Sequence, residues 1–195
     1  VMLPDYISGH KTWENLLKMR PEEAVDLGVY LHVGVGVTGI DRSAKTITDD
    51  RGQTHSYDRL LLTPGSRAFM PREYLTDLAG VLTMRTRHYA VALRRRLRPG
   101  DRAVIVGGGL LGLELAASLR EVDVDVTVIQ RENRLMTRQL DEVASELLHQ
   151  ELTDRGVDIL YNESIRYYVD NGAEVTGVHL SNGQTIPARA VVFAI

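Results

Sequence analysis

The chain has 195 residues, 44% of them apolar and 25% charged, and a formal net charge of −3, a composition that indicates a globular protein without general affinity for nucleic acid or anionic membranes. It contains no cysteine, and its six histidines lack the spacing of a helical metal site, so we expect no disulfide, iron–sulfur cluster or other metal centre within it. No apolar run reaches the ~18 residues of a membrane span and no signal peptide is visible, so we expect a cytoplasmic protein without a membrane partner.

The first third of the chain predicts short elements. Pro21, nearby acids and the closing Gly28 predict a short helix. Residues 29–55 alternate between apolar segments and turns, which is typical of a small antiparallel meander. The apolar run at 59–62, followed by Pro64-Gly65, predicts a buried parallel strand that ends at a ligand-facing loop.

The remainder predicts an α/β fold with a parallel sheet. Pro99-Gly100 is the best candidate for a linker. From residue 102 strands alternate with helices of ten or more residues, as βαβ units require. A hairpin-like excursion around Asn182-Gly183 precedes a last buried strand. Strands are expected at 80–86, 102–107, 125–130, 157–162, 165–170, 175–186 and 189–195, and helices at 87–97, 110–122 and 141–156.

The stretch "RAVIVGGGLLGLELAASL" carries the sharpest motif. Gly107, Gly109 and Gly112 form G-x-G-x-x-G between a strand and a helix, the context that the dinucleotide-binding motif requires. Gly107 permits the tight turn, Gly109 lets the backbone approach a pyrophosphate, and Gly112 lets the helix pack against the strand. The alternative is a glycine-rich turn that serves only close packing.

The residues around these glycines complete the predicted cofactor-binding segment. The unpaired N–H groups at the start of the helix, at Leu110 and Leu111, face the phosphates together with the positive end of the helix dipole. Gly108 belongs to the same segment but has no assigned role.

The residue expected to contact the adenosine ribose does not decide between NADH and NADPH. Gln130 lies about twenty residues beyond the motif, where an acid normally binds the ribose 2′-OH. Its amide can bind a hydroxyl but does not repel a phosphate. Arg131 follows and could accept the 2′-phosphate of NADPH, or be a solvent-exposed arginine. NADH and NADPH therefore both remain open.

The motifs together resemble a known family. "AVIVGGGLLGLELAASL", "VTVIQRENRLMTRQLD" and "YDRLLLTPGS" resemble the two-dinucleotide flavoprotein reductases of the glutathione-reductase-like class. Within that class, "GGGLLGLE" and "LMTRQLD" are most similar to the large subunit of NAD(P)H-dependent nitrite reductase and its assimilatory nitrate reductase relatives. The resemblance implies FAD and either NADH or NADPH as cofactors. It implies that residues 1–98 are the middle part of an FAD-binding domain and 99–195 an NAD(P)H-binding domain, so that the FAD domain is only partly represented.

The resemblance also implies site residues. The stretch Thr63-Pro64-Gly65-Ser66 stands where the family has A-T-G-S against the FAD nucleotide, and Pro64 removes one hydroxyl and one backbone donor. Glu114 is expected in the first turn of its helix, where an acid suits the helix dipole. The family gives it a catalytic position near the nicotinamide and flavin. Val1 aligns with the redox-active cysteine of related NADH oxidases, so cysteine-dependent reactions are not expected.

The resemblance implies hydride transfer from NAD(P)H to FAD. The first hypothesis is the electron-entry module of a nitrite reductase-like enzyme, which passes electrons to an iron–sulfur and siroheme module. The second is a reductase for a small rubredoxin or ferredoxin carrier. The third is a non-catalytic NAD(P)-binding module. A homodimer is left open, and both ends of the chain suggest a piece of a longer protein.

Overall fold

A computed structural model describes residues 3–195, apart from the side chain of Pro21; Val1 lies outside the described residues. The chain divides into two units. One comprises the described residues up to Leu16 together with Arg67–Ile195, and the other comprises Leu17–Ser66. The division into 1–98 and 99–195 that the resemblance implies stays a prediction.

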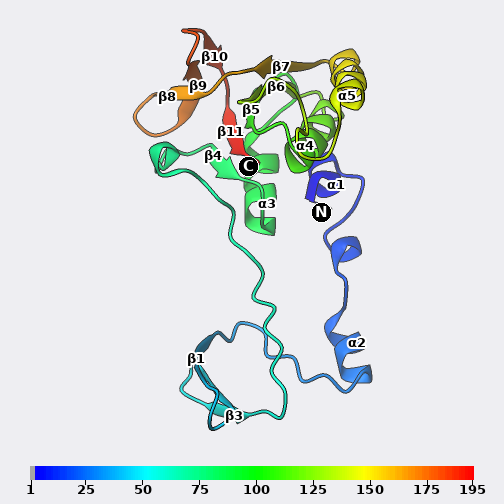
Figure 1. Cartoon of the computed structure of the whole chain (residues 1–195), viewed down its shortest axis with the longest axis vertical. Coiled ribbons are helices and arrows are strands. Elements are labelled where there is room, and N and C mark those ends of the chain that lie inside the picture. The colour runs from blue at the N-terminus through cyan, green and yellow to red at the C-terminus, as the bar shows by residue number, and fades with distance from the viewer. Residues whose placement is uncertain (1–2) are drawn as a thin grey trace. The chain divides into compact units, whose positions relative to one another are not determined.

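The larger unit is built on a parallel sheet of five strands in the order β4-β11-β5-β6-β7 (Figure 1). The chain begins this sheet at one edge with β4, continues from the central β5 through β6 to β7 at the other edge, and returns with β11 between β4 and β5. The predicted α/β class with a Rossmann-like parallel sheet is confirmed. The strands are β4 (Val81–Thr83), β5 (Arg102–Val106), β6 (Asp125–Gln130), β7 (Val157–Tyr161) and β11 (Ala190–Phe193).

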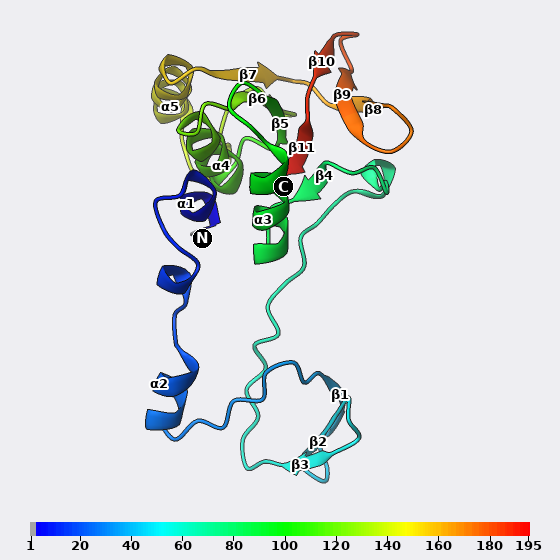
Figure 2. The same ribbon diagram turned by 180° about the vertical axis from the view of Figure 1, so that it is seen from behind.

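Helices cover one face of this sheet. Apolar side chains at helical spacing, such as Leu115 and Leu119, pack on strand residues such as Ile105 and Val128 and are shielded from water. The helix α1 lies beside α3 and α4 in both views (Figures 1 and 2). The helical elements of this unit are α1 (Leu3–Ser8), η1 (Glu14–Leu16), η2 (Arg72–Tyr74), α3 (Arg87–Arg96), α4 (Leu110–Arg120) and α5 (Glu142–Asp154).

A small antiparallel sheet covers the opposite face, so the unit has three layers. Its strands, in the order β10-β9-β8, pack apolar side chains such as Val178 and Ile186 against Val104 and Phe193 of the parallel sheet. This is the predicted excursion, with Gly183 at a positive φ of 89° in its turn. The strands are β8 (Ile165–Asp170), β9 (Val175–Leu180) and β10 (Thr185–Pro187).

The smaller unit contains the helix α2 (Pro21–Asp26) and the expected meander, β1 (Val37–Asp41), β2 (Thr46–Asp49) and β3 (Thr54–Ser56). Residues 29–36, which were expected to open that meander, form no strand. Asp49 is the unit's buried polar anchor: its carboxylate accepts hydrogen bonds from the N–H groups of Arg51 and Gln53 and contacts His55 Nε2 at 3.0 Å.

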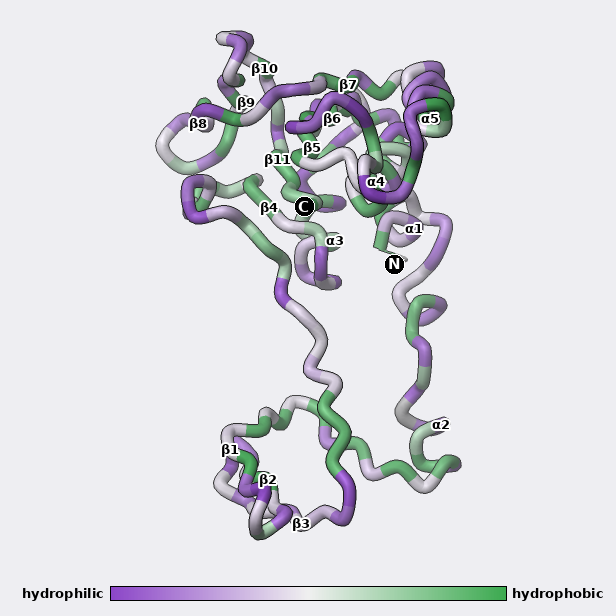
Figure 3. The backbone as a smooth tube through the Cα atoms, viewed as in Figure 1, coloured by the Kyte–Doolittle hydropathy of each residue, from purple (hydrophilic) through white to green (hydrophobic). Residues whose placement is uncertain are grey.

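The strand predicted at residues 59–62 is wrong. The hydrophobic stretch there is plain in Figure 3, yet Leu61 is 84% and Leu62 63% exposed, and neither belongs to a strand. An apolar run becomes a buried strand only where a neighbouring strand pairs with it, and no described segment does so here.

Two other local features bear on the predictions. Pro99-Gly100 forms the turn between α3 and β5 within the larger unit, with Gly100 at a positive φ of 82°. In the described part of the chain, no helix combines the length and the apolar character needed to span a bilayer.

Candidate dinucleotide-binding site

The glycine turn opens a cleft of about 570 Å³ at the carboxyl ends of β5, β6 and β11. In parallel α/β sheets ligands bind at this edge, beyond the carboxyl ends of the strands. The cleft lies entirely within the larger unit. Its walls comprise Phe69, Pro71, Glu73, Tyr74, Val106, Gly107, Gly108, Gly109, Ile129, Gln130, Arg131, Glu132, Met136, Thr137, Arg138, Gln139, Glu163, Ser164, Ala194 and Ile195.

The glycines differ in what surrounds them. Gly107 has a φ of 117°, and a Cβ there would lie 2.8 Å from the carbonyl oxygen of Ala194. A Cβ on Gly112 would lie 2.1 Å from the carbonyl oxygen of Gly107, so the helix can approach the turn only at a glycine. A Cβ on Gly109 would meet no atom within 4 Å. Of these three glycines, only Gly109 therefore has open space where a side chain would stand.

The start of α4 offers unpaired backbone donors at this opening. Gly109 is the N-cap residue, and no side chain caps the helix. The N–H groups of Gly109, Leu110 and Leu111 make no hydrogen bond with another described residue. Unpaired N–H groups at the positive end of a helix dipole favour a phosphate or another anion.

Gly108, which had no role in the sequence analysis, is bonded on both sides. Its N–H donates to the side-chain oxygen of Gln130 at 2.9 Å, and its carbonyl accepts from the N–H of Met136 at 3.0 Å. A Cβ on Gly108 would lie 2.8 Å from Leu135 Cδ2 and 3.2 Å from the Gln130 amide. The absence of a side chain at 108 thus lets the Gln130 amide reach the turn.

Hydrogen bonds from side chains to backbone carbonyls stabilise the loop after β6. The Gln130 Nε2 donates to the carbonyl of Arg134 at 3.2 Å, and the Arg134 guanidinium donates to the carbonyls of Leu140 and Thr137. Met136 adopts a left-handed φ of 46°, which is uncommon for a residue with a side chain. The contacts fix the backbone that carries Arg131 and Arg138, two exposed arginines on the cleft wall.

A second wall of the cleft comes from residues that no sequence motif pointed to. The Tyr74 ring packs against Phe193 with 5.1 Å between centroids, and the Tyr168 hydroxyl donates to the Tyr74 carbonyl at 2.8 Å. Burial raises the pKa of both tyrosines; at Tyr74 the positive charge of Arg131 opposes the rise. Phe69, on the same wall, is 64% exposed. No periodicity or motif marks these residues, because their contacts join distant parts of the chain.

Glu114 does not lie where the sequence analysis expected it. It is the fifth residue of α4, beyond the first turn, which contains no acid. The helix dipole weakens beyond the first turn, so the proposed stabilisation by helix charge does not apply there. Glu114 is half-buried, makes no hydrogen bond or ion pair with another described residue, and is not among the residues that line the cleft.

The stretch Thr63-Pro64-Gly65-Ser66 belongs to the smaller unit and is exposed throughout. None of its residues makes a hydrogen bond with another described residue. Gly65 has a φ of 74°, and a Cβ on it would meet nothing within 4 Å. The hydroxyls of Thr63 and Ser66 and the N–H groups after Pro64 are thus accessible to a ligand.

The chain is similar along its whole length to proteins of known function. The chain is 35% identical over its whole length to the ferredoxin–NAD(+) reductase component of the p-cumate 2,3-dioxygenase system of Pseudomonas putida, of which it covers 46%. It is 30% identical, again over its whole length, to the nitrite reductase (NADH) large subunit of Escherichia coli, of which it covers 23%. The chain therefore spans less than half the length of these relatives.

The fold is shared with solved structures. The crystal structure of the covalent putidaredoxin reductase–putidaredoxin complex matches 98% of this chain and 48% of the solved chain, with a TM-score of 0.92 and 27% identity. The sequence profile of the pyridine nucleotide-disulphide oxidoreductase family matches residues 4–195. The chain therefore belongs to this family, whose members are FAD-dependent oxidoreductases that use NAD(P)H.

Proposed function

We propose that the cleft of the larger unit binds NAD(P)H and that the chain is part of an NAD(P)H-dependent FAD oxidoreductase. The observation that supports this most is the open glycine turn, with the unpaired N–H groups of Gly109, Leu110 and Leu111 beside it. These groups would bind the pyrophosphate, while the fixed loop after β6 would orient the adenosine ribose. Side chains on both cleft walls would exclude water from part of a bound nucleotide.

The residues Thr63, Gly65 and Ser66 fit a contact with FAD, because they leave hydroxyl and backbone donors accessible next to a glycine with open space. When bound, FAD would supply an acceptor for the hydride of NAD(P)H. The contribution of this chain is to bind the nucleotide and to hold it in one orientation, which removes much of the entropic cost of bringing the reactants together. Glu114 stays a candidate for the nicotinamide end of the site.

Two electron acceptors are supported by relatives. The first is an iron–sulfur and siroheme module, as proposed from the resemblance to nitrite reductases and supported by the 30% identical large subunit. The second is a small ferredoxin-type carrier, which the 35% identical reductase component and the putidaredoxin reductase structure favour. A cysteine-rich region further along the gene would support the first acceptor. Reduction of an added ferredoxin by the purified protein would support the second.

Anaerobic titration tests the proposed function. The purified chain is mixed with FAD, and NADH or NADPH is added while the flavin absorption band and the nicotinamide fluorescence are recorded. We expect the fluorescence to change on binding and the flavin band to bleach with at least one nucleotide. Binding without bleaching would instead favour a non-catalytic NAD(P)-binding module. An unchanged fluorescence with both nucleotides would contradict the proposed function.

A further inference from the structure

The side-chain amide of Gln130, at the position expected to contact the ribose, already makes hydrogen bonds within the protein. Its oxygen accepts from the Gly108 N–H at 2.9 Å, and its nitrogen donates to the Arg134 carbonyl at 3.2 Å. The amide joins the glycine turn to the loop after β6, and its side chain is half-buried between them. Gln130 also carries no negative charge, so it does not repel a phosphate on the ribose.

The arginines of the next loop have different environments. The guanidinium of Arg134 is engaged by the backbone carbonyls of Leu140 and Thr137. Arg131 and Arg138, by contrast, are exposed on the cleft and make no hydrogen bond or ion pair with another described residue. A guanidinium binds a phosphate through two parallel hydrogen bonds, and a dianionic phosphate gains most from such a group.

Acidic side chains on the same cleft limit where an anion can lie. Glu163 accepts from the Ser181 hydroxyl at 2.5 Å and from the Asn182 N–H at 3.2 Å, so its carboxylate is engaged. Glu73 and Glu132 are exposed. Glu132 follows Arg131 directly and is the acid that could bind the two ribose hydroxyls of NADH instead. The choice between the nucleotides therefore lies between Arg131 and Glu132.

We propose that the cleft selects the 2′-phosphorylated nucleotide, NADPH, with Arg131 binding the 2′-phosphate, Arg138 adding positive charge, and Gln130 acting as a positioning residue that holds the glycine turn. This proposal rests on the proposed function, since it names the nucleotide that the same cleft takes. It follows from the engaged, uncharged amide of Gln130 together with two unpaired guanidinium groups on the cleft wall.

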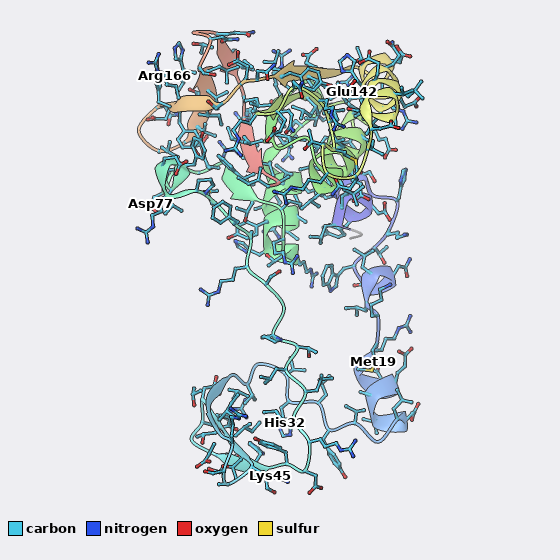
Figure 4. The ribbon with its side chains drawn as sticks, in the orientation of Figure 1. Met19, His32, Lys45, Asp77, Glu142 and Arg166 are labelled. Carbon is cyan, nitrogen blue, oxygen red and sulfur yellow. The ribbon has the colours of Figure 1, made fainter. Side chains whose placement is uncertain are left out.

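Equilibrium binding tests this without any flavin. The dissociation constants of NADPH, NADH, adenosine 2′,5′-bisphosphate and adenosine 5′-monophosphate are measured by calorimetry for the chain and for three variants, R131A, E132Q and R166A. Arg166 lies exposed on β8 (Figure 4) and does not line the cleft, so its substitution is the matched control for loss of one positive charge.

We expect NADPH and the bisphosphate to bind at least about tenfold more tightly than NADH and the monophosphate. R131A should remove most of that difference, because it should weaken NADPH binding about tenfold and leave NADH binding unchanged. R166A should change the affinity for neither nucleotide. E132Q should leave NADH binding unchanged and strengthen NADPH.

The outcomes separate the two proposals. Tighter binding of NADH, with a loss of NADH affinity in E132Q and no effect of R131A, would overturn the NADPH proposal and leave the dinucleotide site intact. An R131A variant that loses affinity for NADH and NADPH equally would also overturn it, because Arg131 would then not bind the 2′-phosphate. Absence of binding by all four probes would overturn both proposals.

Discussion

The side-chain oxygen of Gln130 accepts a hydrogen bond from the backbone N–H of Gly108, 22 residues earlier in the chain, at 2.9 Å. This bond joins the glycine turn after β5 to the end of β6. It explains why the turn contains a third consecutive glycine, for which the G-x-G-x-x-G spacing gives no reason. The turn is held by its neighbours before any nucleotide binds.

Replacement of Gly108 by alanine should break this arrangement. The added Cβ would lie 2.8 Å from buried Leu135 and 3.2 Å from the Gln130 amide, so the side chains must shift. We expect G108A to lower the free energy of unfolding by about 1–3 kcal/mol, as overpacking of a filled site does. Chemical denaturation measures this change.

The matched control is G109A, since a Cβ on Gly109 would meet no atom within 4 Å and its φ of −92° suits any residue. We expect its stability to stay within about 0.5 kcal/mol of the parent chain. Its nucleotide affinity should fall, because the methyl group occupies the open side of the turn. Equal destabilisation by the two substitutions would contradict the role assigned to Gly108.

Ser145 should stabilise the loop that carries Arg131 and Arg138. Its buried hydroxyl donates to the carbonyl of Leu135 at 2.9 Å and so ties α5 to that loop. S145A leaves a buried carbonyl without its donor, and we expect a loss of about 1–3 kcal/mol in the free energy of unfolding.

Thr153, in the same helix, provides the comparison for Ser145. Its exposed hydroxyl donates only to the His149 carbonyl one turn earlier. T153A removes a hydroxyl without leaving a buried group unpaired, so thermal melting should show little change. If S145A and T153A melt at the same temperature, the tie between α5 and the loop contributes nothing to stability.

The fold was predictable where one local pattern suffices. Apolar runs, helical periodicity and the glycines at 107–112 predict β5, α4 and β6 in sequence order, because strand, turn and helix each have a short-range signal. The run at 59–62 shows the limit: hydrophobicity alone does not reveal whether a partner strand exists.

The site was predictable only in its backbone. The glycine spacing marks the turn, but the bond between Gln130 and Gly108 depends on the register of two strands. The packing of Tyr74 on Phe193 joins residues more than a hundred positions apart, and no sequence pattern marks it. The helix begins at Leu110, as expected, so Glu114 is its fifth residue and lies beyond the first turn, where the expectation had wrongly placed it.

Stability of the smaller unit should depend on pH through Asp49. The hydrogen bond with the His55 side chain contributes most to lowering the pKa of the Asp49 carboxyl below its ordinary value. The hydrogen bond from the Gln53 N–H contributes next. A carboxyl with a lowered folded-state pKa stabilises the fold above its unfolded pKa, and this contribution is lost as pH falls through the folded value.

Amide hydrogen exchange of Arg51 and Gln53, which both donate to Asp49, measures this loss. We expect protection to fall as the pH drops below the ordinary range of aspartate. In D49N the change should be absent, because the amide does not titrate. A parent chain whose protection stays constant down to the acid range would refute the link.

The most direct test of the central claim is an amide NMR titration of the chain with NADPH and, separately, with NADH. If the cleft binds a dinucleotide pyrophosphate, the N–H signals of Gly109, Leu110 and Leu111 shift with saturation, while that of Gly172 in the turn between β8 and β9 stays in place. Signals of these three amides that remain unmoved at saturating concentrations of both nucleotides would contradict the account.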